Sequence, residues 1–210
     1  MFVILSALLL GAAPVGTNPQ SVAGLYEIRT MEVGGGLELR ADGRFRYALE
    51  YGAASEEAEG KWTYDGRTVR LTSEPMPKAP AFELVRDDMA PKGQVWMTFE
   101  KGFNWNGRVD ALATAQGVPD KGLVTTEGGG RVDSGGRILT SIEPLVPVYG
   151  TPGGAVRLDP SRGHRLLFRF HPNDVGKAAF RGEALSLEGK DLILHRYDTK
   201  VRFVRAGNGR

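Results

Sequence analysis

Strict alternation of apolar and polar residues on both sides of an Asp-Gly dipeptide is the feature that most constrains this sequence. In residues 37–52, LELRADGRFRYALEYG, the alternation runs up to Asp42-Gly43 and resumes after it. Successive side chains of a strand point to opposite faces, so this pattern buries one face and leaves the other in water. Gly43 supplies the positive φ that a tight turn requires, and the stretch predicts an antiparallel hairpin.

A second hairpin follows at once in residues 61–71, KWTYDGRTVRL, around Asp65-Gly66. Two such units in succession predict an antiparallel meander. No stretch shows a sustained helical period, and the 29 Gly and 12 Pro suit a chain of many short strands and turns. We therefore predict an all-β fold in which the meander forms a small barrel or sandwich. The predicted strands are 24–30, 36–41, 44–51, 60–65, 68–72, 81–86, 94–100, 107–112, 122–126, 137–142, 145–149, 154–158, 164–171, 178–187, 191–196 and 200–205.

Two interruptions divide the chain. Pro75, Pro77 and Pro80 break the meander, and a second discontinuity follows His171-Pro172. After about residue 184 the early alternation returns, so we expect the C-terminal strands to close the sheet of the meander and hide its edges. Residues 21–80 plus 184–207 are predicted to form one β domain, and 81–183 a second, sandwich-like β domain or insert. A plain tandem of two domains is the alternative.

The N-terminus carries an uncharged apolar run, FVILSALLLGAA, at residues 2–13. It has the length of a signal-peptide core and is shorter than the roughly 20 residues of a spanning helix. We predict that residues 1–20 are a signal peptide, that the product is periplasmic or secreted, and that no membrane span remains in the mature chain. The alternative is an apolar first strand of the barrel. The chain has no Cys, which excludes disulfides, thiol nucleophiles and Cys-ligated metals.

Short patterns in the meander resemble those of a known group of β domains. Gly24-x-Tyr26 begins the first strand, ADGRF and GKWTY follow, and Arg202 and Arg205 lie in the last strand. This cadence resembles lipocalin-like (calycin-type) β domains of secreted bacterial proteins, although Tyr26 stands where that family has Trp. The resemblance implies a small barrel in which Tyr26 makes a structural cation–π contact with Arg202 or Arg205 at the closed end.

No catalytic motif emerges. VDSGGR, residues 132–137, is similar to the nucleophile signature of chymotrypsin-like proteases, with Ser134 as the nucleophile. Val132 replaces the first Gly of that signature, however, and no His precedes His164 to act as the general base. We predict a Ser-Gly-Gly turn here and no catalytic residue.

We predict no metal site and no cofactor. His164 and His171 lie an odd number of residues apart on one predicted strand, and His195 is remote, so the three are expected to be structural or surface residues. The other polar candidates also lack the spacing of a metal or phosphate site. They are an acidic loop tip (Glu56, Glu57, Glu59), an acidic pair that alternates faces or caps a turn (Asp87, Asp88), a partial calcium-loop rhythm (Asn104, Asn106, Asp110) and the glycine runs 34–36 and 128–130.

The charge balance bears on partners. The 27 Lys and Arg nearly match the 25 Asp and Glu, so we expect no nucleic-acid partner. A small barrel has room for one ligand, and its predicted binding residues are Phe45, Tyr47, Trp62 and Tyr64, with Trp96 or Trp105 near the domain junction. The alternative is that these rings fill the core. The sequence thus favours a secreted or periplasmic non-catalytic binding protein whose partner is a small apolar ligand or an envelope protein. A structural or assembly accessory of the envelope and an unrecognised hydrolase are the alternatives.

Overall fold

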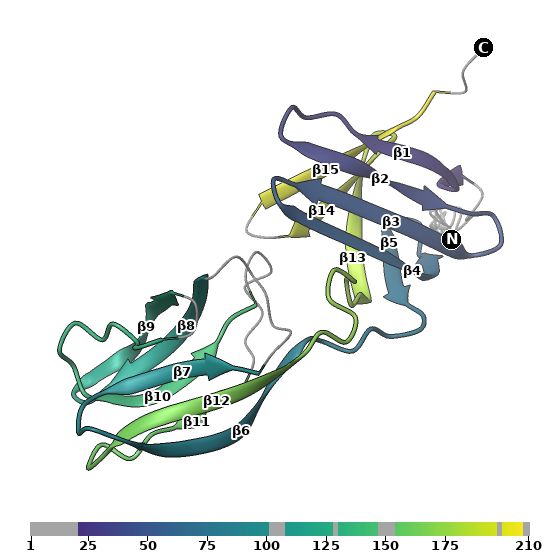
Figure 1. Cartoon of the computed structure of the whole chain (residues 1–210). Coiled ribbons are helices and arrows are strands. Elements are labelled where there is room, and N and C mark those ends of the chain that lie inside the picture. The colour runs from purple at the N-terminus through teal and green to yellow at the C-terminus, as the bar shows by residue number, and fades with distance from the viewer. Residues whose placement is uncertain (1–20, 101–107, 128–129, 147–153, 197–198, 208–210) are drawn as a thin grey trace, which may run out of the picture. The chain divides into compact units, whose positions relative to one another are not determined.

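The computed structural model describes residues 21–100, 108–127, 130–146, 154–196 and 199–207 (Figure 1). These residues form fifteen strands and no α-helix, which confirms the all-β prediction. Within them, no helix is long and apolar enough to cross a membrane. The predicted signal peptide, residues 1–20, lies outside the described residues, as do Asn104, Trp105 and Asn106.

Eight strands close into an antiparallel barrel in the order β1-β15-β14-β13-β5-β4-β3-β2. The C-terminal strands complete it, because β13 pairs with β5 and β15 pairs with β1. The predicted closure of the meander by the end of the chain is therefore confirmed. The strands are β1 (Gly24–Ile28), β2 (Val33–Leu39), β3 (Arg44–Tyr51), β4 (Ala54–Tyr64), β5 (Thr68–Ser73), β13 (Arg181–Glu188), β14 (Asp191–Arg196) and β15 (Thr199–Arg205).

Alternation along these strands builds the barrel core. On β3 the inward positions are buried while Arg46, Ala48 and Glu50 between them are exposed. At Gly60 an added Cβ would lie 2.0 Å from the backbone oxygen of Thr72, so only glycine lets β4 and β5 approach this closely. Buried residues of the barrel core include Leu37, Leu39, Phe45, Tyr47, Trp62, Leu71, Phe180, Leu185 and Phe203.

The predicted acidic loop tip was wrong. Strand β4 begins at Ala54, directly after a turn that contains Gly52, so Glu56, Glu57 and Glu59 lie within the strand. Glu56 is buried, whereas Glu57 and Glu59 are exposed. The alternation was hidden because the inward positions of this half of β4 carry Ala, Glu, Ala and Gly instead of large apolar residues.

Arg205 fastens the chain that precedes β1. Its guanidinium lies over the Tyr26 ring, 5.8 Å from the centroid, and donates hydrogen bonds of 2.7 Å to the backbone oxygens of Ser21 and Ala23. The Tyr26 hydroxyl donates to the oxygen of buried Val22 at 2.6 Å. The predicted cation–π contact is thus present with Arg205. Arg202 instead forms ion pairs with Glu188 and Asp191.

The strands between β5 and β13 form two further sheets, in the orders β11-β10-β8-β9 and β6-β12-β7. Both sheets contribute to one buried cluster, which includes Met97, Leu166 and Phe168 from one and Ala111 and Ile142 from the other. This is the predicted sandwich-like middle portion. Its strands are β6 (Ala81–Ala90), β7 (Val95–Phe99), β8 (Arg108–Ala115), β9 (Val118–Glu127), β10 (Leu139–Pro144), β11 (Val156–Arg157) and β12 (Gly163–His171).

Two local features of the sandwich escaped the sequence analysis. Strands β7 and β12 run parallel, and β8 and β9 are joined by a tight turn at Gln116-Gly117, where Gly117 has a φ of 75°. The predicted ends at residues 112 and 122 therefore left out the strand residues on both sides of this turn. Most of the predicted strand 145–149 lies outside the described residues.

The chain divides into two compact units. Unit 1 comprises the described residues up to Ala48, Glu59–Glu74 and those from Phe180 onward, and unit 2 comprises Leu49–Ala58 and Pro75–Ala179. The predicted boundaries were 80/81 and 183/184. Within unit 2, the segments that enter and leave the sandwich lie side by side. Lys78 donates its amide to the Asp174 carboxylate at 2.8 Å, Asp174 donates its amide to the Lys78 oxygen at 3.1 Å, and the Asn173 side chain donates to the Ala79 oxygen at 2.8 Å.

Replacement of Arg205 by alanine should destabilise the barrel by about 2 kcal/mol, because two charged hydrogen bonds and one cation–π contact are lost together. Urea unfolding followed by circular dichroism measures the change. Arg202→Ala is the matched control on the same strand, since its exposed ion pairs contribute little. Equal effects of the two substitutions would refute the role assigned to Arg205.

Candidate functional site

The predicted ligand residues line the inside of the barrel and contact other residues of the chain. The rings of Phe45 and Tyr47 lie 5.9 and 5.0 Å from that of Phe180, and Tyr47 is 6.2 Å from Phe203. Aromatic rings at these separations pack against each other favourably. The described rings therefore pack against one another inside the barrel.

The other two predicted ligand residues are anchored through their polar atoms. Trp62 is buried and donates its indole N–H to the backbone oxygen of Arg40 at 2.9 Å. The hydroxyl of half-buried Tyr64 donates to the oxygen of Gly66 at 2.8 Å. Trp96, by contrast, lies on β7 of unit 2, where the Arg165 guanidinium is 4.9 Å from its ring centroid.

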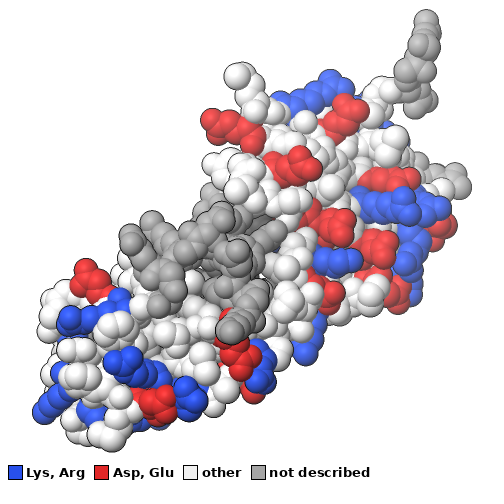
Figure 2. Space-filling view, in the orientation of Figure 1, with Lys and Arg blue, Asp and Glu red and all other residues white. Residues whose placement is uncertain are grey.

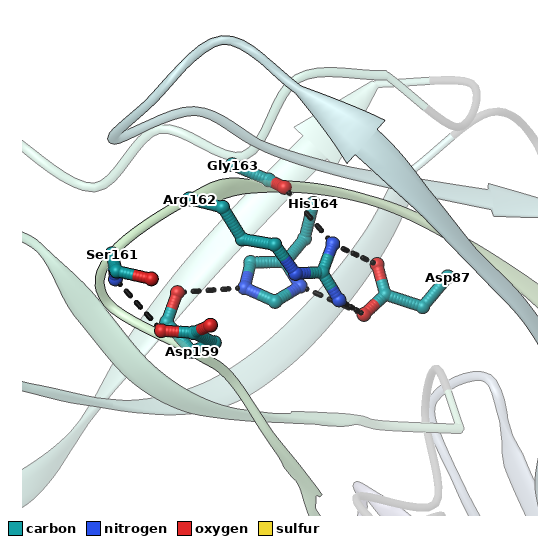
Figure 3. Close-up of polar contacts among 6 residues, drawn as sticks. All are labelled: Asp87, Asp159, Ser161, Arg162, Gly163 and His164. Carbon is teal, nitrogen blue, oxygen red and sulfur yellow. Dashed lines mark hydrogen bonds and ion pairs between the residues drawn. The ribbon is translucent and has the colours of Figure 1, made fainter.

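A partly buried polar cluster in unit 2 is the strongest candidate for chemistry (Figure 3). It joins Asp87 on β6, His164 at the start of β12 and Arg162 just before it. The antiparallel register of β6 and β12 sets Asp87 opposite Leu166. Leu166 and His164 are successive inward residues of β12, so Asp87 lies next to His164. The turn before β12 completes the cluster, because the Asp159 carboxylate accepts the amide of Ser161 at 2.9 Å.

His164 uses both ring nitrogens inside this cluster. Nδ1 is 2.8 Å from Oδ2 of Asp87, and Nε2 is 3.0 Å from the backbone oxygen of Asp159. The Asp87 carboxylate also pairs with both terminal nitrogens of Arg162, and Arg162 donates to the Gly163 oxygen at 3.2 Å. His164 is 2% exposed, whereas a fifth of the Asp87 side chain is accessible.

This arrangement determines what the His164 ring can do. A backbone oxygen can only accept a hydrogen bond, so Nε2 carries a proton and donates a hydrogen bond to the backbone oxygen of Asp159. In an Asp-His-Ser triad, that nitrogen must instead face the nucleophile's hydroxyl. Because Nε2 is hydrogen-bonded to the backbone, His164 has a structural role: it links Asp87 on β6 to Asp159 in the turn before β12.

Asp87 and Asp88 lie on opposite faces of β6. The sequence left open whether this acidic pair alternates faces of a strand or caps a turn, and in the structure the two residues alternate faces. The Asp87 carboxylate contacts His164, whereas Asp88 pairs with Arg86 at 2.7 Å on the exposed side. No sequence signal links Asp87 to His164, because 77 residues separate them and only the strand register brings them together.

Ser134 lies in a turn, as predicted. The Asp133 carboxylate accepts a hydrogen bond from the Gly135 amide at 2.9 Å. The backbone oxygen of Ser134 accepts hydrogen bonds from the amide and the Nε of Arg137. Gly135 and Gly136 have φ values of 59° and 75°, which glycine adopts readily. The similarity of this stretch to a protease signature is therefore explained by turn chemistry.

The remaining histidines are at the surface. His195 is exposed, and His171 Nε2 contacts Glu83 at 2.8 Å. Arg169 bridges Glu83 to Glu100, which it binds through two nitrogens at 2.8 and 3.0 Å. The hydrogen bond from His171 and the charge of Arg169 lower the pKa of Glu83, and the hydrogen bond from Arg169 lowers the pKa of Glu100.

Within the described residues, no three His, Asp or Glu side chains converge as metal ligands would. Comparison of the chain with protein-family models, with curated proteins and with solved structures gives no match.

Removal of the Asp87 carboxylate should destabilise unit 2 by about 3 kcal/mol, because it leaves buried His164 and the Arg162 guanidinium without their shared acceptor. Thermal unfolding of Asp87→Ala measures the loss. Asp88→Ala is the control, since the Asp88 carboxylate next to Asp87 is exposed and, among the residues that the structure describes, is seen to pair with Arg86. A similar small change in the stability of both variants would refute the structural role assigned to the contacts of Asp87 with His164 and Arg162.

The pKa of Asp159 is lowered chiefly by the hydrogen bond from the Ser161 hydroxyl and also by the Ser161 amide. A lowered carboxyl pKa adds stability above the unfolded value, roughly 3.9, and that stability is lost as the pH falls through the folded value. We expect Ser161→Ala to raise the Asp159 pKa toward its ordinary value in a carboxyl NMR titration. Asp65 is the internal control, because its pKa is lowered by the amides of Thr68 and Arg67 and should not move. An unchanged Asp159 titration would refute the assignment.

Proposed function

We propose that this chain is a secreted or periplasmic, non-catalytic interaction protein that binds an extended segment of a protein partner at the edge strand β6. The barrel serves as the scaffold in this proposal, and unit 2 carries the binding surface. The observation that carries the proposal is that β6 is an edge strand, with no further strand of the described residues paired to its outer side.

Strand β6 is at the end of the order β6-β12-β7 and follows the rim of its sheet in Figure 1. The opposite edge of the same sheet is covered, because residues 130–132 run along β7. Met97 donates its amide to the Gly130 oxygen at 2.9 Å, and Val132 donates its amide to the Val95 oxygen at 2.8 Å. An edge strand presents backbone donors and acceptors to a further strand. Strand β6 is thus the place where this sheet can be extended.

The apolar side chains that follow Phe82 at Leu84, Val85 and Met89 of β6 are exposed to solvent. Phe82 is buried, but Leu84, Val85 and Met89 are 37%, 39% and 76% exposed. A β-bulge at Val85 contributes, since Leu84 pairs with Phe168 and Arg86 pairs with the preceding residue, Leu167. Apolar side chains are therefore available next to the backbone of the edge.

The charges on β6 are already matched inside the chain. Glu83 pairs with His171 and Arg169, and Asp87 pairs with Arg162 and His164. Arg86 and Asp88 pair with each other. The edge therefore offers backbone groups and apolar side chains without a net demand for charge, which suits strand addition by an extended partner segment.

The edges of the other sheet in unit 2 are poorer sites. Strand β11 has two residues, and β9 carries Pro119 and Gly122, which weaken pairing along a strand. The outer surface of the barrel carries intermixed charges on the face shown in Figure 2. On the barrel, Glu74 pairs with both Arg44 and Lys61. Among the sheet edges of unit 2, β6 is therefore the best suited to pair with a partner strand.

A photo-crosslinking amino acid at position 89 should give a discrete protein adduct in cells that export the chain. The same group at Leu25, an exposed apolar position of the barrel, is the control and should give none. Val85→Lys should abolish the adduct at position 89, because a lysine on a strand edge opposes pairing. Identical adduct patterns at the two positions, or none at position 89, would overturn the proposal.

A further inference from the structure

We infer that the segment that pairs with β6 is the β6 strand of a second copy of this chain, so that two sheets join into one in the order β7-β12-β6-β6-β12-β7. This inference rests on the proposed function, because it names the partner of the same edge. It follows from the sequence of the exposed part of β6 and from the contacts that its charged residues already make.

Residues 85–89, VRDDM, are complementary to themselves when two copies run antiparallel about Asp87. That register sets Arg86 opposite Asp88 of the second copy, and Val85 opposite Met89 of the second copy. Arg86 and Asp88 share the exposed face of β6, as their 2.7 Å ion pair shows, so opposite charges meet twice across the junction. Directly opposed residues of unlike charge and apolar pairs both stabilise antiparallel strands.

The residue at the centre of this register is Asp87, and two aspartates would meet there. Each carboxylate is held by its own Arg162 and His164, with Nδ1 of the histidine 2.8 Å away. The side chain is only 20% exposed. The central carboxylates are therefore turned into their own units and neutralised there, which removes the main obstacle to pairing.

Symmetry also favours a second copy as the occupant. Pairing of β6 with β6 is isologous, so it closes on a two-fold axis and consumes both free edges. The far end of each sheet is bordered by residues 130–132 along β7 and does not continue the assembly. The expected product is a dimer and not an open-ended array.

The test uses charge reversal and its compensation in the full chain. Sedimentation equilibrium should show a dimer for the unaltered protein. Arg86→Asp should raise the dissociation constant by at least about tenfold, because by symmetry each substitution acts at two pairs. The double variant Arg86→Asp/Asp88→Arg should restore the dimer, since opposite charges again face each other. Circular dichroism melting of each variant checks that unit 2 stays folded.

The outcomes separate this inference from the proposed function. A monomer at all concentrations, or a dimer that Arg86→Asp leaves intact, overturns the β6–β6 pairing. If position 89 then crosslinks to a different protein, the proposed function stands and only the identity of the partner changes. If position 89 gives no adduct and the chain is monomeric, both fail. An adduct of twice the chain's mass, lost in Arg86→Asp and restored in the double variant, supports both.

Discussion

Closure of the barrel depends on a reciprocal pair of hydrogen bonds between Ser73 and Phe180. Ser73 donates its amide to the Phe180 oxygen at 2.9 Å, and Phe180 donates its amide to the Ser73 hydroxyl at 3.0 Å across 107 residues of chain. Both residues are buried, and the Phe180 ring packs on Phe45 and Tyr47. This contact starts the pairing of β13 with β5, without which the meander would keep two open edges.

Bringing such distant residues together costs conformational entropy, and the inserted unit lowers that cost. Lys78 and Asp174 exchange hydrogen bonds where the chain enters and leaves the sandwich, so a folded unit 2 presents its two ends together. Loop closure across a folded insert then involves a few residues on each side instead of more than a hundred flexible ones.

The two units use polar groups in different ways. At the start of the barrel, Arg205 ties backbone oxygens to an aromatic ring, which fixes the chain before β1. In unit 2, His164 and Arg162 converge on one carboxylate and fix the turn before β12 against β6. Neither arrangement leaves a nucleophile and a base free to act together, so both are structural. Unit 2 also has the exposed edge strand β6, where recognition under the proposed function would depend on backbone pairing and shape.

The sequence by itself determined the all-β class, the Asp-Gly hairpins and the turn at Ser134, because alternation and turn chemistry act between near neighbours. The alternation that resumes after about residue 184 also suggested that the C-terminal strands return to the meander, and the pairing of β13 with β5 and of β15 with β1 confirms it. The resemblance to lipocalin-like domains implied a contact of Tyr26 with Arg202 or Arg205, and the structure has the contact with Arg205. The prediction from the sequence misjudged the first half of β4, where Ala and Gly at inward positions conceal the period. Only the tertiary structure decided the parallel pairing of β7 with β12, the meeting of Asp87 with His164 and the exposure of β6. These features depend on which distant strands become neighbours and in what register, and no local pattern of residues encodes that choice.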